Sequence, residues 1–362
     1  MKKLQLKSNE LIHVLEPLQA VINPGHIVPI LQCVKIITNG TELSVIGDNH
    51  EVRCQNSMPC KGDEIEICVD FSMLLTALKG LKDQDVNIKV DSKIMKIIHD
   101  KGDFKIPLEE TSSFPDPKTD DLDKSATIGI KNLKKALKIA NKFLLNDSLE
   151  PMSNLSIQVQ EKKIIVRSSN NTTLFQEKIK GGGDEASILV SGKTSSAIFL
   201  LMEEEVDEVE LRYSESRIFF KFGNKEVTAI QQQGKFPLVQ FEKIISTIDD
   251  SEVLKIDKIS LITSLRRVSS LSMKEKLSMV KMILDRQNLN LSCNNENSSS
   301  QVKEDLPVKF KGKEKILAYN AKMLIEILSV FDDECEFSIN KGNCFCMKTK
   351  RMSGLIAPML LS

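Results

Sequence analysis

One stretch near the start of the chain decides its organisation: residues 11–22, LIHVLEPLQAVI. Leu11, Leu15, Leu18 and Ile22 are spaced by four, three and four residues, so one face of a helix carries all of them. The same spacing returns about 120 residues later and then once more, which indicates an internal repeat. The matching positions are Leu133, Leu137, Ala140 and Leu144 in the second copy, and Leu261, Leu265, Val268 and Ser272 in the third, where Ser272 breaks the apolar pattern.

Two other kinds of segment recur in a constant order around this helix. An alternating strand that ends in small polar residues follows it, at residues 43–45, 164–166 and 289–291. A second apolar helix comes next, at 74–78, 197–201 and 324–328, before alternating strands at 86–90, 209–213 and 335–339. This order predicts an α+β protein of three tandem similar domains, each with two helices packed on antiparallel sheets.

Polar stretches rich in Asp and Pro separate the three copies. Residues 116–123, DPKTDDLD, and 246–251, STIDDS, have the composition of linkers. We therefore expect domains at residues 1–122, 123–250 and 251–362. The glycines at 181–183 lack the Gly-Lys-Ser/Thr ending of a phosphate-binding loop, so we expect them to form a connecting loop inside the second domain.

Charge and composition exclude several classes of function. The 50 Lys and Arg residues balance 50 Asp and Glu residues, which rules out a uniformly basic surface but not a basic lining. The four histidines all lie in the first copy and the eight cysteines form no CxxC pair, so we expect no catalytic site, metal site or cofactor. No apolar run is long enough for a signal peptide or a membrane span, so we expect a cytoplasmic protein.

A basic stripe marks the first helix of the second copy. Lys131, Lys134, Lys138 and Lys142 follow helical spacing, with Lys135 beside them, while the apolar residues occupy another face. At a rise of about 1.5 Å per residue the stripe spans about 17 Å and could follow a phosphate backbone without reading bases. The other basic residues on or beside the repeated helices are Lys79, Lys82, Arg266, Arg267, Lys274 and Lys276. Each could be a solvated helix face, but their recurrence favours a shared DNA-facing surface.

Short motifs lie along the repeat in a fixed order. They are residues 28–31 (VPIL) with 40–45 (GTELSV), 113–116 (SFPD), 234–237 (GKFP), 315–320 (KILAYN) and 357–361 (APMLL). Together they resemble the bacterial sliding clamp family, the beta subunit of DNA polymerase III, over essentially the whole chain. The resemblance implies a homodimer joined head to tail into a closed ring, whose helices line a hole that encircles double-stranded DNA. It also implies a non-catalytic processivity factor, placed on DNA by a clamp loader, that tethers the replicative DNA polymerase.

The family also binds peptides that carry a clamp-binding motif, in an apolar cleft between the second and third domains. Carried over by position, the cleft would contain Met152, Ser168, Asn170, Asn171, Thr172, Leu174, Pro237, Phe241, Ile244, Pro358, Met359 and Leu360. This chain has Asn-Asn-Thr-Thr at 170–173 where the family usually has Gly-His-Arg-Leu, and Leu360 where the family has Arg. The departure leaves open a clamp-fold paralogue with a restricted partner set. A protein-binding scaffold with no topological role on DNA is the alternative from another class.

Overall fold

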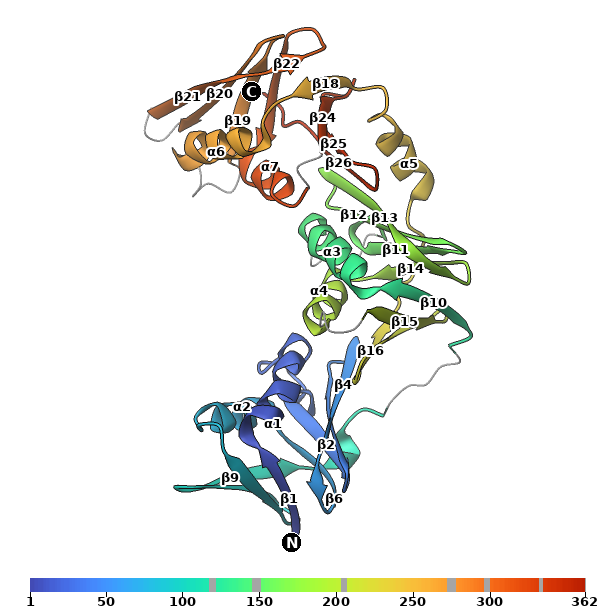
Figure 1. The fold of residues 1–362 in the computed structure, drawn as a ribbon, viewed down its shortest axis with the longest axis vertical. Helices are drawn as coiled ribbons and strands as arrows, with labels where there is room; N and C mark the ends of the chain where they lie inside the picture. The colour runs from blue at the N-terminus through green and yellow to red at the C-terminus, as the bar shows by residue number, and fades with distance from the viewer. Residues whose placement is uncertain are drawn as a thin grey trace.

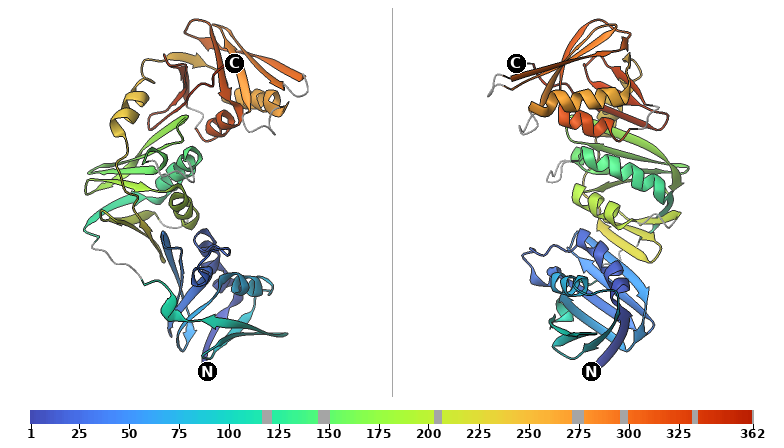
Figure 2. Two further views of the ribbon diagram at one scale, coloured as in Figure 1. Left: turned by 180° about the vertical axis from the view of Figure 1, so that it is seen from behind. Right: turned by 60° about the vertical axis from the view of Figure 1, so that its left-hand side comes forward.

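The chain forms a crescent with helices on its concave side and sheets on its convex side (Figure 1). The computed structural model describes residues 1–116, 122–144, 151–202, 207–271, 278–295, 300–331 and 335–361. Three similar α+β parts follow one another along the crescent, and two further views show the same layering (Figure 2). The predicted fold class, three tandem α+β domains with helices on antiparallel sheets, is confirmed; the boundaries at 122/123 and 250/251 remain predictions.

The first part contains two helices and two connected sheets. Its elements are β1 (Lys2–Lys7), α1 (Ser8–Leu15), β2 (Cys33–Asn39), β3 (Glu42–Asp48), β4 (Val52–Pro59), β5 (Lys61–Gly62), β6 (Glu64–Asp70), α2 (Phe71–Lys79), β7 (Asp85–Val90), β8 (Ile94–His99) and β9 (Gly102–Glu109). All strand pairings in this part are antiparallel.

The second part repeats this plan. Its elements are β10 (Lys124–Gly129), α3 (Ile130–Ala140), β11 (Leu155–Gln160), β12 (Lys163–Ser169), β13 (Thr173–Gly183), β14 (Ala186–Val190), α4 (Gly192–Leu201), β15 (Glu208–Tyr213), β16 (Arg217–Phe222) and β17 (Lys225–Ile230). A further helix, α5 (Leu238–Ser246), follows on the convex side, and the repeat did not predict it (Figure 1).

The third part closes the chain. Its elements are β18 (Glu252–Lys255), α6 (Lys258–Val268), β19 (Met279–Leu284), β20 (Asn288–Asn295), β21 (Ser300–Pro307), β22 (Lys309–Phe310), β23 (Lys315–Asn320), α7 (Ala321–Leu328), β24 (Glu336–Ile339), β25 (Phe345–Lys348) and β26 (Met352–Ile356). A strand leads into a helix twice in each part, with at most two residues between them, and several of these junctions are capped by a side chain. Asp70, Ser191, Asp257 and Asn320 accept a hydrogen bond from the backbone N–H three residues on, a cap worth about 0.5–2 kcal/mol.

The apolar faces that recur along the sequence form one core. Leu11, Leu133 and Leu261 are all fully buried at equivalent places in the three parts. Each of the three first helices is shorter than its apolar pattern, since the last turn is a 3-10 helix, at Glu16–Ala20, Asn141–Phe143 and Ser269–Leu271. In the first case Pro17 explains the change, because it lacks the N–H that would continue an α-helix.

Backbone pairing continues across both junctions between the parts. Strand β4 pairs with β17, and β13 pairs with β26, each in antiparallel register. The convex side is therefore an almost continuous hydrogen-bonded surface, which fixes the curvature of the concave side that carries the helices.

The expectation of a loop at residues 181–183 is wrong. Strand β13 continues through Gly181, Gly182 and Gly183, and these residues pair with β10. A side chain on Gly182 or Gly183 would collide with the backbone carbonyl of Glu161 or Ser125. The three glycines are thus required by the close approach of neighbouring backbones.

Candidate DNA-facing surface and partner cleft

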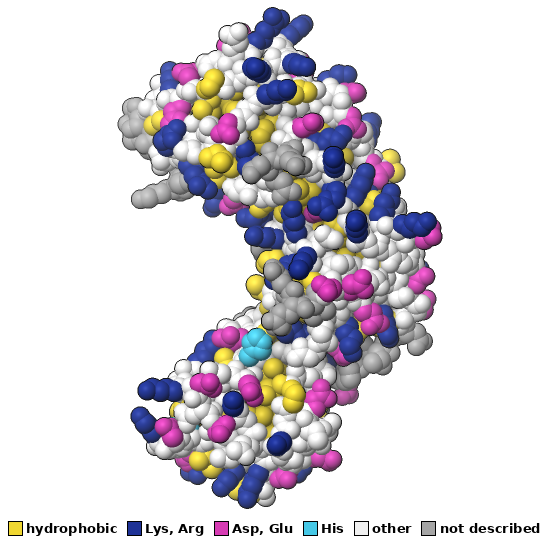
Figure 3. All heavy atoms as spheres, viewed as in Figure 1, with side chains coloured by type: hydrophobic (Ala, Val, Ile, Leu, Met, Phe, Trp, Pro, Cys, Tyr) yellow, Lys and Arg dark blue, Asp and Glu magenta, His cyan; other side chains and the backbone are white. Residues whose placement is uncertain are grey.

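Helix α3 presents lysines to the concave side of the crescent. Its apolar residues, which include Leu133, Ala136 and Leu137, are buried against the sheet. Lys131, Lys138 and Lys142 are exposed, and Lys134 and Lys135 are half-buried beside them. Figure 3 shows Lys and Arg side chains gathered where α3 borders the concave side. The predicted stripe therefore forms one surface, although Lys142 stands on the 3-10 turn after α3.

The basic residues of the first part lie near the end of α2. Lys79 forms an ion pair with Glu16, with 2.7 Å between Nζ and Oε1, across the gap to the 3-10 turn after α1. Lys82 is exposed just beyond the helix. Because Lys79 already has an acidic partner, its charge is less available to a phosphate than that of Lys82.

The two arginines of α6 have different surroundings. Arg267 binds Glu304 of β21 through two hydrogen bonds, from Nε to Oε1 at 2.6 Å and from Nη2 to Oε2 at 2.7 Å. The hydrogen bonds from Arg267 hold the pKa of Glu304 below its ordinary value. Arg266 is exposed on the same helix. Arg267 therefore holds α6 to the strand at the tip of the crescent, while Lys274 and Lys276 lie outside the described residues.

One group of the predicted cleft residues lies around the turn between β12 and β13. The Asn170 Oδ1 atom accepts hydrogen bonds from the backbone N–H groups of Thr172 and Thr173 and from both hydroxyls. Asn171 has a positive φ of 68°, which asparagine tolerates. Ser168 is buried at the end of β12. The turn is thus held by its own polar side chains.

The C-terminal tail passes beside this turn. The Ala357 N–H donates to the Thr172 carbonyl at 2.8 Å, and the Met359 N–H donates to the Ala318 carbonyl at 2.7 Å. The Thr172 hydroxyl also reaches the sulfur of Met323 on α7, at 3.7 Å. Pro358 and Leu360 are exposed, and Leu360 has 95% of its surface in solvent. The structure therefore brings the tail, the turn and α7 together.

A second group of the predicted cleft residues lies in and around α5. Leu174 and Phe241 belong to a small apolar core that also contains Leu189, Phe236, Ile248, Cys346 and Leu355, with Met152 at its edge. Phe241 is fully buried, so it supports α5 and offers no open surface to a peptide in this structure. Pro237 is half-buried before α5, and Ile244 is exposed on that helix.

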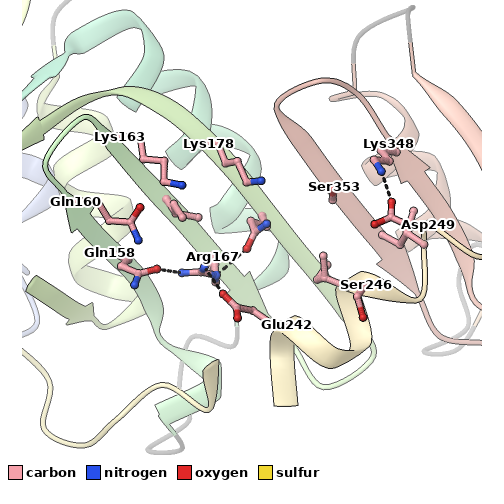
Figure 4. A pocket seen from close by; sticks show the side chains of 14 residues that line it. Gln158, Gln160, Lys163, Arg167, Lys178, Glu242, Ser246, Asp249, Lys348 and Ser353 are labelled. Atoms are coloured by element: carbon pink, nitrogen blue, oxygen red, sulfur yellow. Dashed lines mark hydrogen bonds and ion pairs between the residues drawn. The ribbon is translucent and has the colours of Figure 1, made fainter. Parts of the chain in front are cut away.

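A polar pocket that the sequence did not indicate lies on the convex side, between α5 and the sheet (Figure 4). Its centre is Arg167 of β12, which is 1% exposed. Arg167 donates to the side-chain oxygens of Gln176 at 2.8 Å, Gln158 at 2.9 Å and Glu242 of α5 at 3.2 Å. Burial lowers the pKa of Arg167, and the nearby Glu242 charge opposes that shift. The signal in the sequence that could have indicated this site is the presence of Gln158, Arg167 and Gln176 on three successive strands.

Several cysteines have strongly shifted thiol pKa values. All eight cysteines are free thiols, and burial raises the pKa of Cys54, Cys68 and Cys346 to about 12. Over the part of the chain that the structure describes, no group of three or more His, Cys, Asp or Glu residues could hold a metal ion. In the same part, no helix is both long enough and apolar enough to cross a membrane.

The fold is that of a sliding clamp. The chain superposes on a DNA polymerase sliding clamp from Pseudomonas aeruginosa with a TM-score of 0.90 at 18% identity, covering 100% of both chains. It superposes on the beta sliding clamp of C. crescentus with a TM-score of 0.91 at 19% identity, covering 99% of this chain and 100% of that one. The sliding clamp of Bartonella birtlesii, bound to griselimycin, gives a TM-score of 0.92 at 17% identity with both chains fully covered.

Family models give the second, independent finding. Residues 2–118 match the N-terminal domain of the DNA polymerase III beta subunit, and residues 247–356 match its C-terminal domain. The chain belongs to the DNA polymerase III beta subunit family. A search of curated protein sequences finds no match.

Proposed function

We propose that the protein is a DNA sliding clamp, a non-catalytic processivity factor that encircles duplex DNA in the cytoplasm and tethers a replicative DNA polymerase. The observation that carries the proposal is the lysine surface of α3 on the concave side of a crescent. Lysines contact phosphates without reading sequence, so a ring lined by them can move along DNA. Balanced net charge is compatible with this role, because the lysines of α3 form a local basic surface on the concave side while acidic residues elsewhere balance the total.

Ring closure would use the two tips of the crescent, where Figure 1 shows β9 and β21. Over most of its length β9 pairs only with β8, and β21 pairs only with β20, among the residues that the structure describes. An edge strand with a free row of backbone groups is a template for another strand. Because the two edges lie at opposite ends of one chain, their pairing is head to tail, and two crescents close a ring.

The C-terminal tail beside the turn at Asn170 is the proposed partner cleft. The tail supplies exposed apolar side chains at Pro358 and Leu360, and Met323 lies next to Thr172. A clamp-binding peptide of a polymerase or clamp loader would place its apolar residues against them. The polar turn at 170–173 favours a partner set narrower than that of clamps with a basic turn.

The solution mass tests ring closure. A closed homodimer has twice the mass of the 40.6 kDa chain, and light scattering coupled to size exclusion measures it directly. A monomer at micromolar concentration, or a trimer, would refute the two-subunit ring while leaving the fold unchanged.

A further inference from the structure

The convex pocket under α5 faces away from the lysine surface of α3. Alternate residues of β12 point to opposite sides of the sheet: Ile164 and Val166 enter the main core beneath the helices, whereas Ile165 and Arg167 line the pocket. The pocket has a volume of about 390 Å³ and is bounded by β11, β12, β13, α5 and the ends of β25 and β26. It therefore joins the second and third parts on the outside of the crescent.

Two lysines, Lys163 and Lys178, line one end of this pocket, and Lys180 lies beside them on the same face of the sheet. Lys163 of β12 and Lys180 of β13 are directly opposed in the antiparallel register, and Lys178 lies two residues along from Lys180 on the same face. All three are exposed, and no ion pair between described residues involves them. Like charges directly opposed across two strands are destabilising. The close placement of these three lysines therefore does not stabilise the fold. An anionic partner would relieve the repulsion between them.

The centre of the pocket is rich in hydrogen-bond donors. An arginine can only donate, so the side-chain oxygens of Gln158 and Gln176 must face Arg167 and their NH2 groups are the parts left to donate. Figure 4 shows Lys163 and Lys178 above Arg167, with Asp249 and Lys348 at the far end. Ile165, Ile245 and Ile248 add apolar surface. Donors beside apolar side chains suit a segment that carries both carboxylates and an apolar residue.

We propose that this pocket binds an acidic peptide segment of a partner protein on the outside of the crescent, separately from DNA and from the tail cleft. A nucleic-acid backbone suits it less well. The side chains of Glu242 and Asp249 also line the pocket and are 57% and 64% exposed, and both carboxylates would repel a run of phosphates. A short peptide can place its carboxylates at the lysine end of the pocket, away from Glu242 and Asp249.

Peptide selection on the full-length protein tests this site. A random dodecapeptide phage library is first depleted on Lys163→Glu/Lys178→Glu/Lys180→Glu, which removes peptides that bind the tail cleft, and is then selected on the unmodified chain. Affinities of the enriched peptides are measured by fluorescence anisotropy for both proteins. The matched control is Lys309→Glu/Lys311→Glu/Lys313→Glu, an equal charge change at three other exposed lysines. Duplex DNA and inorganic phosphate serve as competitors.

The expected result is enrichment of Asp- and Glu-rich peptides whose affinity falls about ten-fold or more in the pocket variant and changes little in the control. Three results would each overturn the proposal. The enriched peptides could lack acidic residues, or they could bind the pocket variant and the control variant with equal affinity. Alternatively, duplex DNA or phosphate could displace them at lower concentrations than an acidic peptide does. If the Glu variant does not fold, Lys163→Ser/Lys178→Ser/Lys180→Ser replaces it. That variant should melt no lower than the unmodified protein, since it removes like-charge repulsion.

Discussion

Arg167 of β12 and Glu242 of α5 join the convex sheet to the helix between the second and third parts, with 3.2 Å between Nη2 and Oε1. The two partners differ in exposure: the Arg167 side chain is 2% exposed and that of Glu242 is 57% exposed. A fully buried cation needs all its acceptors, whereas an exposed carboxylate is well solvated by itself. The free energy of unfolding should therefore depend more on Arg167 than on Glu242.

Removal of either partner should reveal this asymmetry. Arg167→Ala should lower the free energy of unfolding by about 2–4 kcal/mol, because it leaves Gln158 and Gln176 without their donor and opens a cavity. Glu242→Gln should cost less than about 1 kcal/mol, since the carboxylate is more than half exposed. Urea unfolding midpoints measure both. Equal losses would show that the ion pair, and not the burial of the arginine, holds α5.

The lysine surface of α3 should determine the salt dependence of DNA binding. If Lys131, Lys138 and Lys142 each contact one phosphate, replacement of all three by Ala should reduce the slope of log affinity against log salt by about 2.7. Fluorescence anisotropy with a short duplex at several salt concentrations measures the slope, and Lys309→Ala/Lys311→Ala/Lys313→Ala is the control. An unchanged slope in the α3 variant would mean that this helix does not face DNA.

The tail should be needed for partner binding but not for assembly. Truncation after Ala357 removes the Met359 backbone contact with Ala318 and the exposed side chains of Pro358 and Leu360. We expect at least ten-fold weaker binding of a C-terminal peptide from the host's replicative polymerase, with an unchanged solution mass. Calorimetric titration measures the affinity, and full affinity in the truncated chain would place the peptide site elsewhere.

The contact between Arg267 and Glu304 should make one tip of the crescent sensitive to acid. The folded pKa of Glu304 lies below its ordinary value of 4.5, so the pair stabilises the fold above that pH and the contribution disappears as pH falls through the lowered pKa. Glu304→Gln should melt below the unmodified protein at pH 7, and the difference should shrink steadily below pH 4.5. A difference that stays constant down to pH 3 would exclude this pair as its source.

The sequence predicted those features that depend on local periodicity. Leu11 and its counterparts are buried because a repeated apolar spacing forces a repeated buried face. Helix α5 was missed although Leu238, Phe241 and Ile245 follow helical spacing, because it stands outside the repeat and its packing partners come from both neighbouring parts. Arg167 was not singled out, and the glycines at 181–183 were wrongly expected in a loop, since their surroundings come from strands that meet only in the folded chain.

The candidate sites show the same difference between features set by local spacing and features set by contacts between distant segments. Helical spacing was enough to predict that Lys131, Lys138 and Lys142 share a surface, because α3 and the 3-10 turn that continues it carry all three. The partner cleft depends on which strands lie beside the tail, so the sequence could not show that Leu174 and Phe241, both carried over by position, pack into one buried core at α5. Residues that act through contacts between domains need the three-dimensional arrangement.

Retention on DNA of different topology tests the proposed function most directly. The protein is loaded by its host's clamp loader and ATP onto nicked circular DNA, separated from free protein at moderate salt, and followed after the circle is cut once. We expect the protein to remain on the circle and to leave the linear product within minutes, because linkage and not affinity holds it. Equal retention on circular and linear DNA would contradict a clamp that encircles the duplex.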